Sequence, residues 1–300
     1  MLSIQAENIK RVLLQNKNLE QVLNTPLEKQ RKNWEESAST DIIPDIIFTE
    51  KTVIRNISVE WVSMKNSSKQ NIILYFHGGG FNQGSTITHR KLAAYIVKAA
   101  HVPILMHNYP LTPENPYPAA LVSSEQIYSY LLENGYQPEN IILGGDSSGG
   151  GLALALTLLL KDKKVPLPKG VFLLSPMVDF TLSGDTLKTN EEKDPLLFVE
   201  DLQITVNRYI AKESPFNPLI SPIFGDLRGI PPMFIQVGSD ELLLSDSTRL
   251  AELARASQTD VQLSVWEGMW HVFQVWVSEI PEASESIESI ARFTQTITIR

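Results

Sequence analysis

The stretch NIILGGDSSGGGLALALTLLL, residues 140–160, predicts a strand that turns sharply into a helix, because an apolar run typical of a strand leads through glycines into an apolar run typical of a helix. Inside it, Gly145-Asp146-Ser147-Ser148-Gly149 fits the pattern G-x-S-x-G only with Ser147 at the centre. A sharp turn from strand to helix exposes this central residue, and the glycines let backbones approach without Cβ clashes. The stretch predicts Ser147 as a nucleophile, with the amide of Ser148 facing an oxyanion beside it.

Two other interpretations fit the same letters: a Gly/Ser-rich turn without a catalytic role, and a phosphate-binding loop. A Walker-type phosphate loop is disfavoured because no Lys-Ser or Lys-Thr pair follows the glycines. A serine hydroxyl needs a base, and the base needs an orienting acid, so the rest of the chain decides between the interpretations.

Short β-rich runs alternate with helical patterns from about residue 54 onward, which predicts an α/β fold with a mostly parallel central sheet and helices on both faces. The first run is longer and alternating, which favours an antiparallel hairpin or edge pair before the parallel strands. The runs are VIRNISVEWVSM (53–64), NIILYFH (71–77), VPILMHNY (102–109), NIILGG (140–145), GVFLLSP (170–176), PMFIQVGS (232–239) and VQLSVWEG (261–268).

Two segments do not follow this rhythm. Residues 1–45 precede the sheet, and residues 180–218 form an insertion between two strands with a helical stretch of its own. We expect the two segments to build a small cap together, over a core made of residues 46–179 and 219–300.

A second glycine motif follows the strand-like run at 71–77. The motif is His77-Gly78-Gly79-Gly80, and it is typical of a loop whose backbone amides complete an oxyanion hole from the neighbouring strand. A flexible glycine turn is the alternative, which the G-x-S-x-G motif downstream disfavours.

His271 is the predicted base because it is the only one of the five histidines that follows Ser147, as the chain order Ser, Asp, His of this architecture requires. For the acid we predict Asp240, which comes just after a strand, where a short loop holds a carboxylate well. Glu241 and Asp246 are the local alternatives, although they also fit carboxylates at a helix N-terminus. Asp146 is expected to have a structural hydrogen-bonding role.

Composition excludes several classes of function. A net charge of −8 with scattered Lys and Arg argues against nucleic-acid binding, and the absence of cysteine rules out a thiolate nucleophile or a thiolate metal site and suits a reducing cytoplasm. No cluster with metal-ligand spacing is present, so we expect no metal and no cofactor.

The longest apolar run, GLALALTLLL, is about half the length of a membrane span and predicts a buried helix. We expect the N-terminal residues to belong to the mature fold.

Together these motifs resemble those of the hormone-sensitive-lipase-like esterases (the bacterial family IV type) of the α/β-hydrolase superfamily. That family carries HGGG and G-D-S-A-G-G, seen here as HGGG and GDSSGG, followed by GSDELL and GMWHVF. The resemblance implies a serine carboxylic ester hydrolase for short acyl chains, with a helical cap. It also implies Ser147 as nucleophile, Asp240 as acid, His271 as base, and the amides of Gly79, Gly80 and Ser148 as oxyanion donors.

Two departures from the family pattern stand out. Ser148 occupies the position where the family usually has alanine, which keeps the amide but adds a hydroxyl beside the nucleophile. Pro110 and Thr112 replace residues of the family's Y-R-L-A-P-E stretch, so any ion pair of that arginine is absent.

The triad does not choose the leaving group, so a lactone or amide hydrolase is an alternative, and a catalytically silent binding protein on this fold is another. We expect a small-molecule ester substrate, no membrane insertion, and a homodimer formed through the edge run VQLSVWEG.

Overall fold

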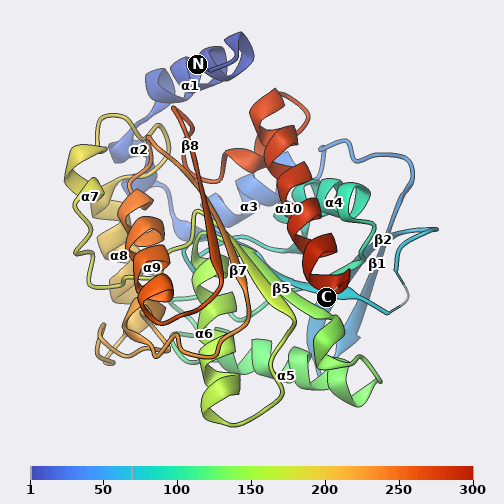
Figure 1. Ribbon diagram of the computed structural model, residues 1–300. Coiled ribbons are helices and arrows are strands. Elements are labelled where there is room, and N and C mark those ends of the chain that lie inside the picture. Colours follow the sequence, from blue (N-terminus) through green and yellow to red (C-terminus); the bar gives the residue numbers. More distant parts are fainter. Residues whose placement is uncertain (1, 69, 300) are drawn as a thin grey trace.

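A computed structural model describes residues 2–68 and 70–299 and contains one eight-stranded sheet with helices on both faces (Figure 1). The strand order is β1-β2-β4-β3-β5-β6-β7-β8, and β3 to β8 are parallel, whereas β2 is antiparallel to both of its neighbours. The strands are β1 (Ile47–Ile54), β2 (Ile57–Met64), β3 (Ile72–Phe76), β4 (Ile104–His107), β5 (Ile141–Asp146), β6 (Gly170–Leu174), β7 (Met233–Gly238) and β8 (Val261–Trp266). The predicted α/β fold is confirmed.

The predicted hairpin is present, but its first strand begins earlier than the sequence indicates. Arg55 and Asn56 turn the chain between β1 and β2 with φ values of 51° and 64°, as a two-residue hairpin turn requires. The inner residues of β1 are exposed, so it shows no apolar alternation, and the pattern predicted a strand only from residue 53.

Two helical layers bury the two faces of the sheet. The longer helices are α1 (Ile4–Asn16), α3 (Leu27–Ala38), α4 (Thr86–Ala100), α5 (Ala119–Glu133), α6 (Ser148–Asp162), α8 (Val199–Ile210), α9 (Leu244–Ala256) and α10 (Pro281–Ile299); α2 (Leu19–Asn24) and α7 (Thr186–Thr189) are short. Successive residues of β3 alternate between the two cores, as the period of two in a strand demands: Ile72 and Leu74 pack with α5, α6 and α9, and Ile73 packs with α4 and α10.

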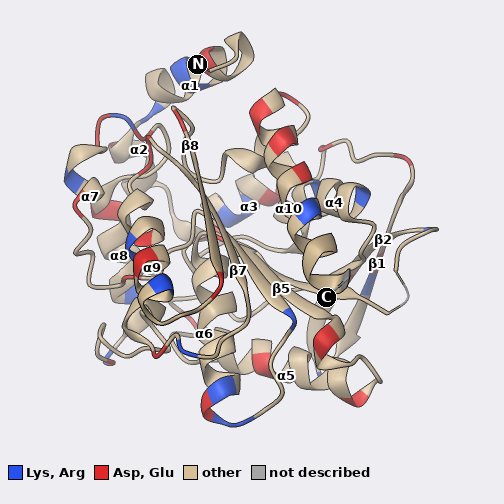
Figure 2. Cartoon of the chain, viewed as in Figure 1, with Lys and Arg blue, Asp and Glu red and all other residues tan. Residues whose placement is uncertain are grey.

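The apolar run GLALALTLLL forms the buried inner helix α6. Across residues 2–68 and 70–299, none of the helices combines the length and apolarity needed to cross a bilayer. Basic and acidic residues are interspersed over the helices and loops around the strands (Figure 2).

Helices α1 to α3 precede the sheet, and α7 and α8 lie in the insertion after β6; Figure 1 shows α2, α7 and α8 on the same side of the molecule. Lys17, between α1 and α2, donates hydrogen bonds to the carbonyls of Glu191 and Asp194 in the insertion, at 3.0 and 2.7 Å. Its ammonium group also lies 4.6 Å from the ring centre of Phe198. The two segments outside the α/β rhythm therefore contact each other.

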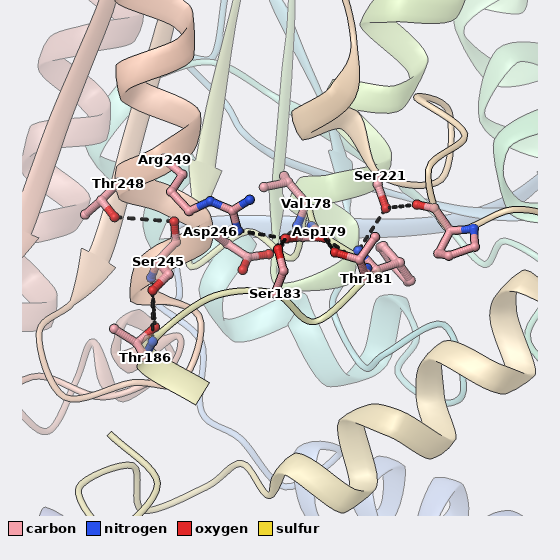
Figure 3. Close-up of polar contacts among 12 residues, drawn as sticks. Val178, Asp179, Thr181, Ser183, Thr186, Ser221, Ser245, Asp246, Thr248 and Arg249 are labelled. Carbon is pink, nitrogen blue, oxygen red and sulfur yellow. Dashed lines mark hydrogen bonds and ion pairs between the residues drawn. The ribbon is translucent and has the colours of Figure 1, made fainter. Parts of the chain in front are cut away.

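A buried polar cluster fixes the chain where the insertion begins (Figure 3). Asp246, in the first turn of α9, accepts hydrogen bonds from the amides of Val178 and Asp179 at 2.8 and 3.0 Å. The Asp179 carboxylate in turn binds Arg249 at 2.7 Å and the hydroxyl of Ser183 at 2.6 Å. These bonds connect the loop after β6 to α9, and so fix the first residues of the insertion.

Candidate active site

The turn from β5 into α6 forms a strained elbow with Ser147 at its tip. Ser147 has φ 52° and ψ −125°, a conformation that a non-glycine residue adopts only where its surroundings enforce it. Its amide donates to the carbonyl of Leu174 at 2.8 Å, and its own carbonyl accepts from Met177 at 2.9 Å. A Cβ on Gly149 would lie 2.1 Å from the carbonyl oxygen of Phe76, so only glycine allows α6 to start this close to the loop after β3.

The structure brings Ser147 and His271 together, although 124 positions separate them in the chain. His271 Nε2 lies 3.0 Å from Ser147 Oγ, within hydrogen-bonding distance. The histidine follows Met269 and Trp270, both fully buried, which anchor the loop after β8. The imidazole is thus in place to take the hydroxyl proton.

Glu241 is the carboxylate that contacts this histidine. Its Oε1 lies 3.2 Å from His271 Nδ1. Its Oε2 accepts hydrogen bonds from Ser175 Oγ at 2.7 Å and from the amide of Gly238 at 2.9 Å. Glu241 is fully buried, so these bonds fix the carboxylate and leave one oxygen for the imidazole.

The prediction of Asp240 as the acid is corrected by this geometry. Asp240 forms an ion pair with Lys10 of α1 and accepts a hydrogen bond from Ser239 Oγ at 2.9 Å. Consecutive residues in the short turn after β7 point in different directions, and the turn directs Glu241 inward. Asp246, the other alternative, binds the amides of Val178 and Asp179 instead.

Glu241 also sets the electrostatics of the imidazole. Burial alone lowers the pKa of His271. The hydrogen bond and negative charge of Glu241, with smaller contributions from the charges of Asp194 and Asp146, outweigh this effect, and the pKa rises above its ordinary value. The contact with Glu241 therefore favours the protonated form of the imidazole.

The glycine loop between β3 and α4 lies against the start of α6. Gly79 has φ 114° and Gly80 has φ 62°, values that favour glycine. The amide of Gly78 donates to Asp146 at 3.1 Å, and the amide of Phe81 donates to Ser148 Oγ at 3.3 Å. In the part of the chain that the structure describes, the amides of Gly79, Gly80 and Ser148 have no hydrogen-bond partner.

The hydroxyl of Ser148, which the family pattern lacks, thus binds the glycine loop to the first turn of α6. Ser148 is fully buried, so its bond to the Phe81 amide is shielded from water. The Ser148 hydroxyl therefore accepts the hydrogen bond of the Phe81 amide, which follows the unpartnered amides of Gly79 and Gly80 in the chain.

Asp146 has the structural role predicted for it. Its carboxylate accepts from Tyr75 at 2.7 Å and from the Gly78 amide at 3.1 Å, and lies 3.1 Å from Nε2 of His89. His77 stacks on Tyr109 with ring centres 4.1 Å apart, and burial lowers its pKa to about 3. These residues form a buried layer beneath the glycine loop.

Several residues that support the site carry no local sequence signal. Ser175 binds both Glu241 and the amide of Val272, next to the histidine. In the insertion, Asn190 donates to the carbonyl of Glu241 at 3.0 Å. All of these contacts join residues more than 45 positions apart, so no short motif contains them; the left-handed φ of 46° at Ser175 becomes visible only in the structure.

Comparisons with known proteins place the chain in a family. A family model described as the alpha/beta hydrolase fold matches residues 73–275. An esterase of Acinetobacter venetianus is 39% identical over 232 residues, 77% of each chain, and an acetyl-hydrolase of Streptomyces hygroscopicus is 36% identical over 82% of each chain.

Among solved structures, an esterase from the bacterial hormone-sensitive lipase family superposes with a TM-score of 0.93 at 32% identity, covering 99% of both chains. On the family model and these matches, the chain belongs to the α/β-hydrolase fold family and, within it, to the bacterial hormone-sensitive lipase family.

Proposed function

We propose that this protein is a serine carboxylic ester hydrolase in which Ser147, His271 and Glu241 form the catalytic triad. The observation that carries the proposal is the continuous chain of contacts from Ser147 Oγ to His271 Nε2, and from His271 Nδ1 to Glu241 Oε1. A nucleophile, a base and an orienting carboxylate in hydrogen-bonding sequence are what acyl transfer requires.

In the first step, Ser147 Oγ attacks the carbonyl carbon of the ester while His271 Nε2 takes the hydroxyl proton. The tetrahedral intermediate then collapses, the bond to the alcohol breaks, and His271 returns the proton to the leaving oxygen. Glu241 stays ionised and stabilises the imidazolium. The products of this step are a free alcohol and an acyl group bound to Ser147.

Water repeats the cycle in the second step. His271 takes a proton from the water as its oxygen attacks the acyl carbon, and the proton passes to Ser147 Oγ when the acyl bond breaks. The carboxylic acid leaves and the free serine is regenerated, so the reaction consumes one water for each ester and needs no further reactant.

We assign the oxyanion hole to the amides of Gly79, Gly80 and Ser148. Their support is twofold: the neighbouring amides of Gly78 and Phe81 are occupied by side chains, and the loop lies against the start of α6, whose dipole favours negative charge. Each donor of this kind is worth about 3 kcal/mol to the transition state.

We propose short-chain acyl esters as the substrate class and two segments of the chain as the cap over the acyl pocket. The relative named an acetyl-hydrolase supports short acyl chains. We propose that residues 1–45 and 180–218 form the cap that lines the acyl pocket over a core of residues 46–179 and 219–300, because Lys17 links the two segments.

Two further proposals concern the protein as a whole. β8 lies at the end of the sheet with Val265 exposed, which supports a homodimer through this edge; size-exclusion chromatography with light scattering tests it. A cytoplasmic location, consistent with the cysteine-free sequence, remains a prediction that cell fractionation tests.

Labelling with an organophosphate tests the catalytic proposal against its alternatives. Reaction with p-nitrophenyl diethyl phosphate should release one p-nitrophenol per chain, and peptide mass spectrometry should find the diethylphosphoryl group on Ser147. A silent binding protein would not label. Product analysis then separates substrates, because a lactone gives one hydroxy acid, whereas an ester gives an acid and an alcohol.

A further inference from the structure

The part of the glycine loop that follows Gly80 is held by residues from three distant segments. Asn82 lies at the centre of these contacts and is 5% exposed. Its side-chain oxygen accepts from Thr112 Oγ1 at 2.6 Å, and its side-chain nitrogen donates to Thr205 Oγ1 of α8 at 2.8 Å. Its backbone carbonyl accepts from Arg31 Nε of α3 at 2.6 Å. Both segments proposed as the cap therefore bind this one residue.

Arg31 joins the glycine loop to the loop that follows β4. Besides the bond to Asn82, its Nη2 donates to the carbonyl of Thr112 at 2.6 Å. Both terminal nitrogens also bind the carboxylate of Glu114, at 2.8 and 2.9 Å. The partner of the Glu114 carboxylate is thus Arg31 of α3, which lies 83 positions earlier in the chain. A planar guanidinium can bind two carbonyls and a carboxylate at once, and lysine cannot reproduce this fork.

The loop needs such support because its backbone is unusual. Three consecutive residues have φ in the left-handed region: Gly79 at 114°, Gly80 at 62° and Phe81 at 57°. For Phe81, which has a Cβ, this conformation costs about 1–2 kcal/mol. The ring of Phe81 stacks on Tyr209 of α8, with ring centres 3.8 Å apart and planes 6° apart. The loop conformation therefore depends on contacts from α3 and α8.

We infer that Arg31 is a positioning residue for the oxyanion hole, acting through the carbonyl of Asn82 to hold the amides of Gly79 and Gly80 in place. This inference rests on the proposed function of those amides. Asn82 and the glycines form one tight turn, because the amides of Asn82 and Gln83 both donate to the carbonyl of Gly79 at 3.0 Å. Displacement of Asn82 therefore moves the peptide groups that carry the donors.

This role makes the N-terminal helix α3 part of the catalytic apparatus, in addition to any contact it makes with substrate. Misplaced donors weaken the transition state more than the bound substrate, so kcat should fall while KM changes little. Loss of one well-placed oxyanion donor lowers kcat about 100-fold, which sets the upper end of the expected effect.

The experiment compares Arg31→Met, Arg31→Lys and Glu114→Gln. Glu114→Gln is the matched control, because it removes the exposed carboxylate partner of Arg31 and leaves both carbonyl bonds intact. For each variant, kcat and KM for p-nitrophenyl butyrate are measured and normalised by titration of active sites with p-nitrophenyl diethyl phosphate. The Ki of an alkyl trifluoromethyl ketone, which adds to the serine and forms an oxyanion, is the second readout.

For Arg31→Met we expect kcat per titrated site to fall about 10- to 100-fold, KM to stay within about threefold, and the trifluoromethyl ketone Ki to rise in proportion to the loss in kcat/KM. Arg31→Lys should recover part of the loss, and Glu114→Gln should stay within about twofold of the wild type. If Arg31→Met does not fold, Thr205→Val removes the α8 bond to Asn82 and should give a smaller fall with the same correlation between kcat/KM and Ki.

A normal kcat and Ki in Arg31→Met would overturn the inference, as would an equal loss in Glu114→Gln. Loss of titratable sites without a change in kcat per site would also overturn it, because that result describes a purely structural role. The variant Ser147→Ala separates the two proposals. If Ser147→Ala is active, the proposed function itself is wrong. If Ser147→Ala is inactive and Arg31→Met has normal kinetics, only the proposed role of Arg31 is wrong.

Discussion

Glu241 Oε1 lies 3.2 Å from His271 Nδ1, while Asp240, one position earlier, forms an ion pair with Lys10 of the first helix. Two adjacent carboxylates thus have separate roles, one inside the site and one at its edge. Lys10 also donates to the carbonyl of Gly268 at 2.9 Å, so Lys10 links α1 both to Asp240 and to the loop that carries the histidine.

Exchange of each carboxylate for its amide distinguishes the two roles. Glu241→Gln should lower kcat/KM roughly 10³- to 10⁴-fold, because the amide favours the wrong imidazole tautomer and removes the charge that stabilises the imidazolium. Asp240→Asn should keep activity within about threefold, because it loses only a partly exposed ion pair. Initial rates on p-nitrophenyl acetate measure both. If Asp240→Asn were inactive and Glu241→Gln stayed active, Asp240 and not Glu241 would be the acid of the triad.

The pH dependence of kcat/KM should report the raised pKa of His271. The reaction needs the neutral imidazole, so activity is lost as the pH falls through this pKa. Burial acts to lower the pKa, but the hydrogen bond and charge of Glu241 raise it, so the acid limb should lie above the ordinary value of about 6.5. In Glu241→Gln the largest contributions that raise the pKa are gone, whereas the charges of Asp194 and Asp146 stay, so the residual activity should have its acid limb at lower pH. An unchanged limb in that variant would mean that Glu241 does not set the pKa.

Ser175→Ala should lower kcat about tenfold with little change in KM. The hydroxyl of Ser175 donates to Glu241 and accepts from the amide of Val272, so its loss loosens the acid and leaves a buried amide unpaired, at a cost of about 1–3 kcal/mol. The matched control is Ser123→Ala, because the buried hydroxyl of Ser123 has no partner within the described residues. Equal kinetics for the two variants would remove Ser175 from the catalytic apparatus.

Asp246 should make stability depend on pH. Burial, together with the charge of Asp179, raises its pKa to about 7. A group whose folded-state pKa is raised contributes stability that is complete below its unfolded pKa of about 4 and is lost as the pH rises through the folded value. The free energy of unfolding in urea should therefore fall between about pH 4 and pH 7, and Asp246→Asn should reduce this difference. The exposed Asp162→Asn is the control; an unreduced difference in Asp246→Asn would contradict the assignment.

The sequence predicted the parts of the molecule that short-range patterns encode. The strand, glycines and helix around Ser147 form one continuous stretch, and chain order left His271 as the only available base. In the structure the two side chains lie 3.0 Å apart, and their catalytic roles stay predictions. The parallel strands β3 to β7 were recognisable because burial on both faces makes them largely apolar.

The choice between Asp240 and Glu241 could not be made from the sequence, because one residue of difference in a turn reverses the direction of a side chain. The contacts of Arg31 with Asn82 and of Ser175 with Glu241 were also out of reach. Each joins segments more than 50 positions apart, and their packing depends on the assembled sheet and helices.

Hydrolysis of p-nitrophenyl esters from acetate to palmitate, with wild type and Ser147→Ala side by side, is the decisive test of Ser147 as the nucleophile of an ester hydrolase. We expect fast release of p-nitrophenol from the short-chain esters by the wild type, and a loss of at least about 10⁴-fold in a folded Ser147→Ala variant. Substantial activity of Ser147→Ala, or no activity of a folded wild type on any of these esters, would contradict this assignment.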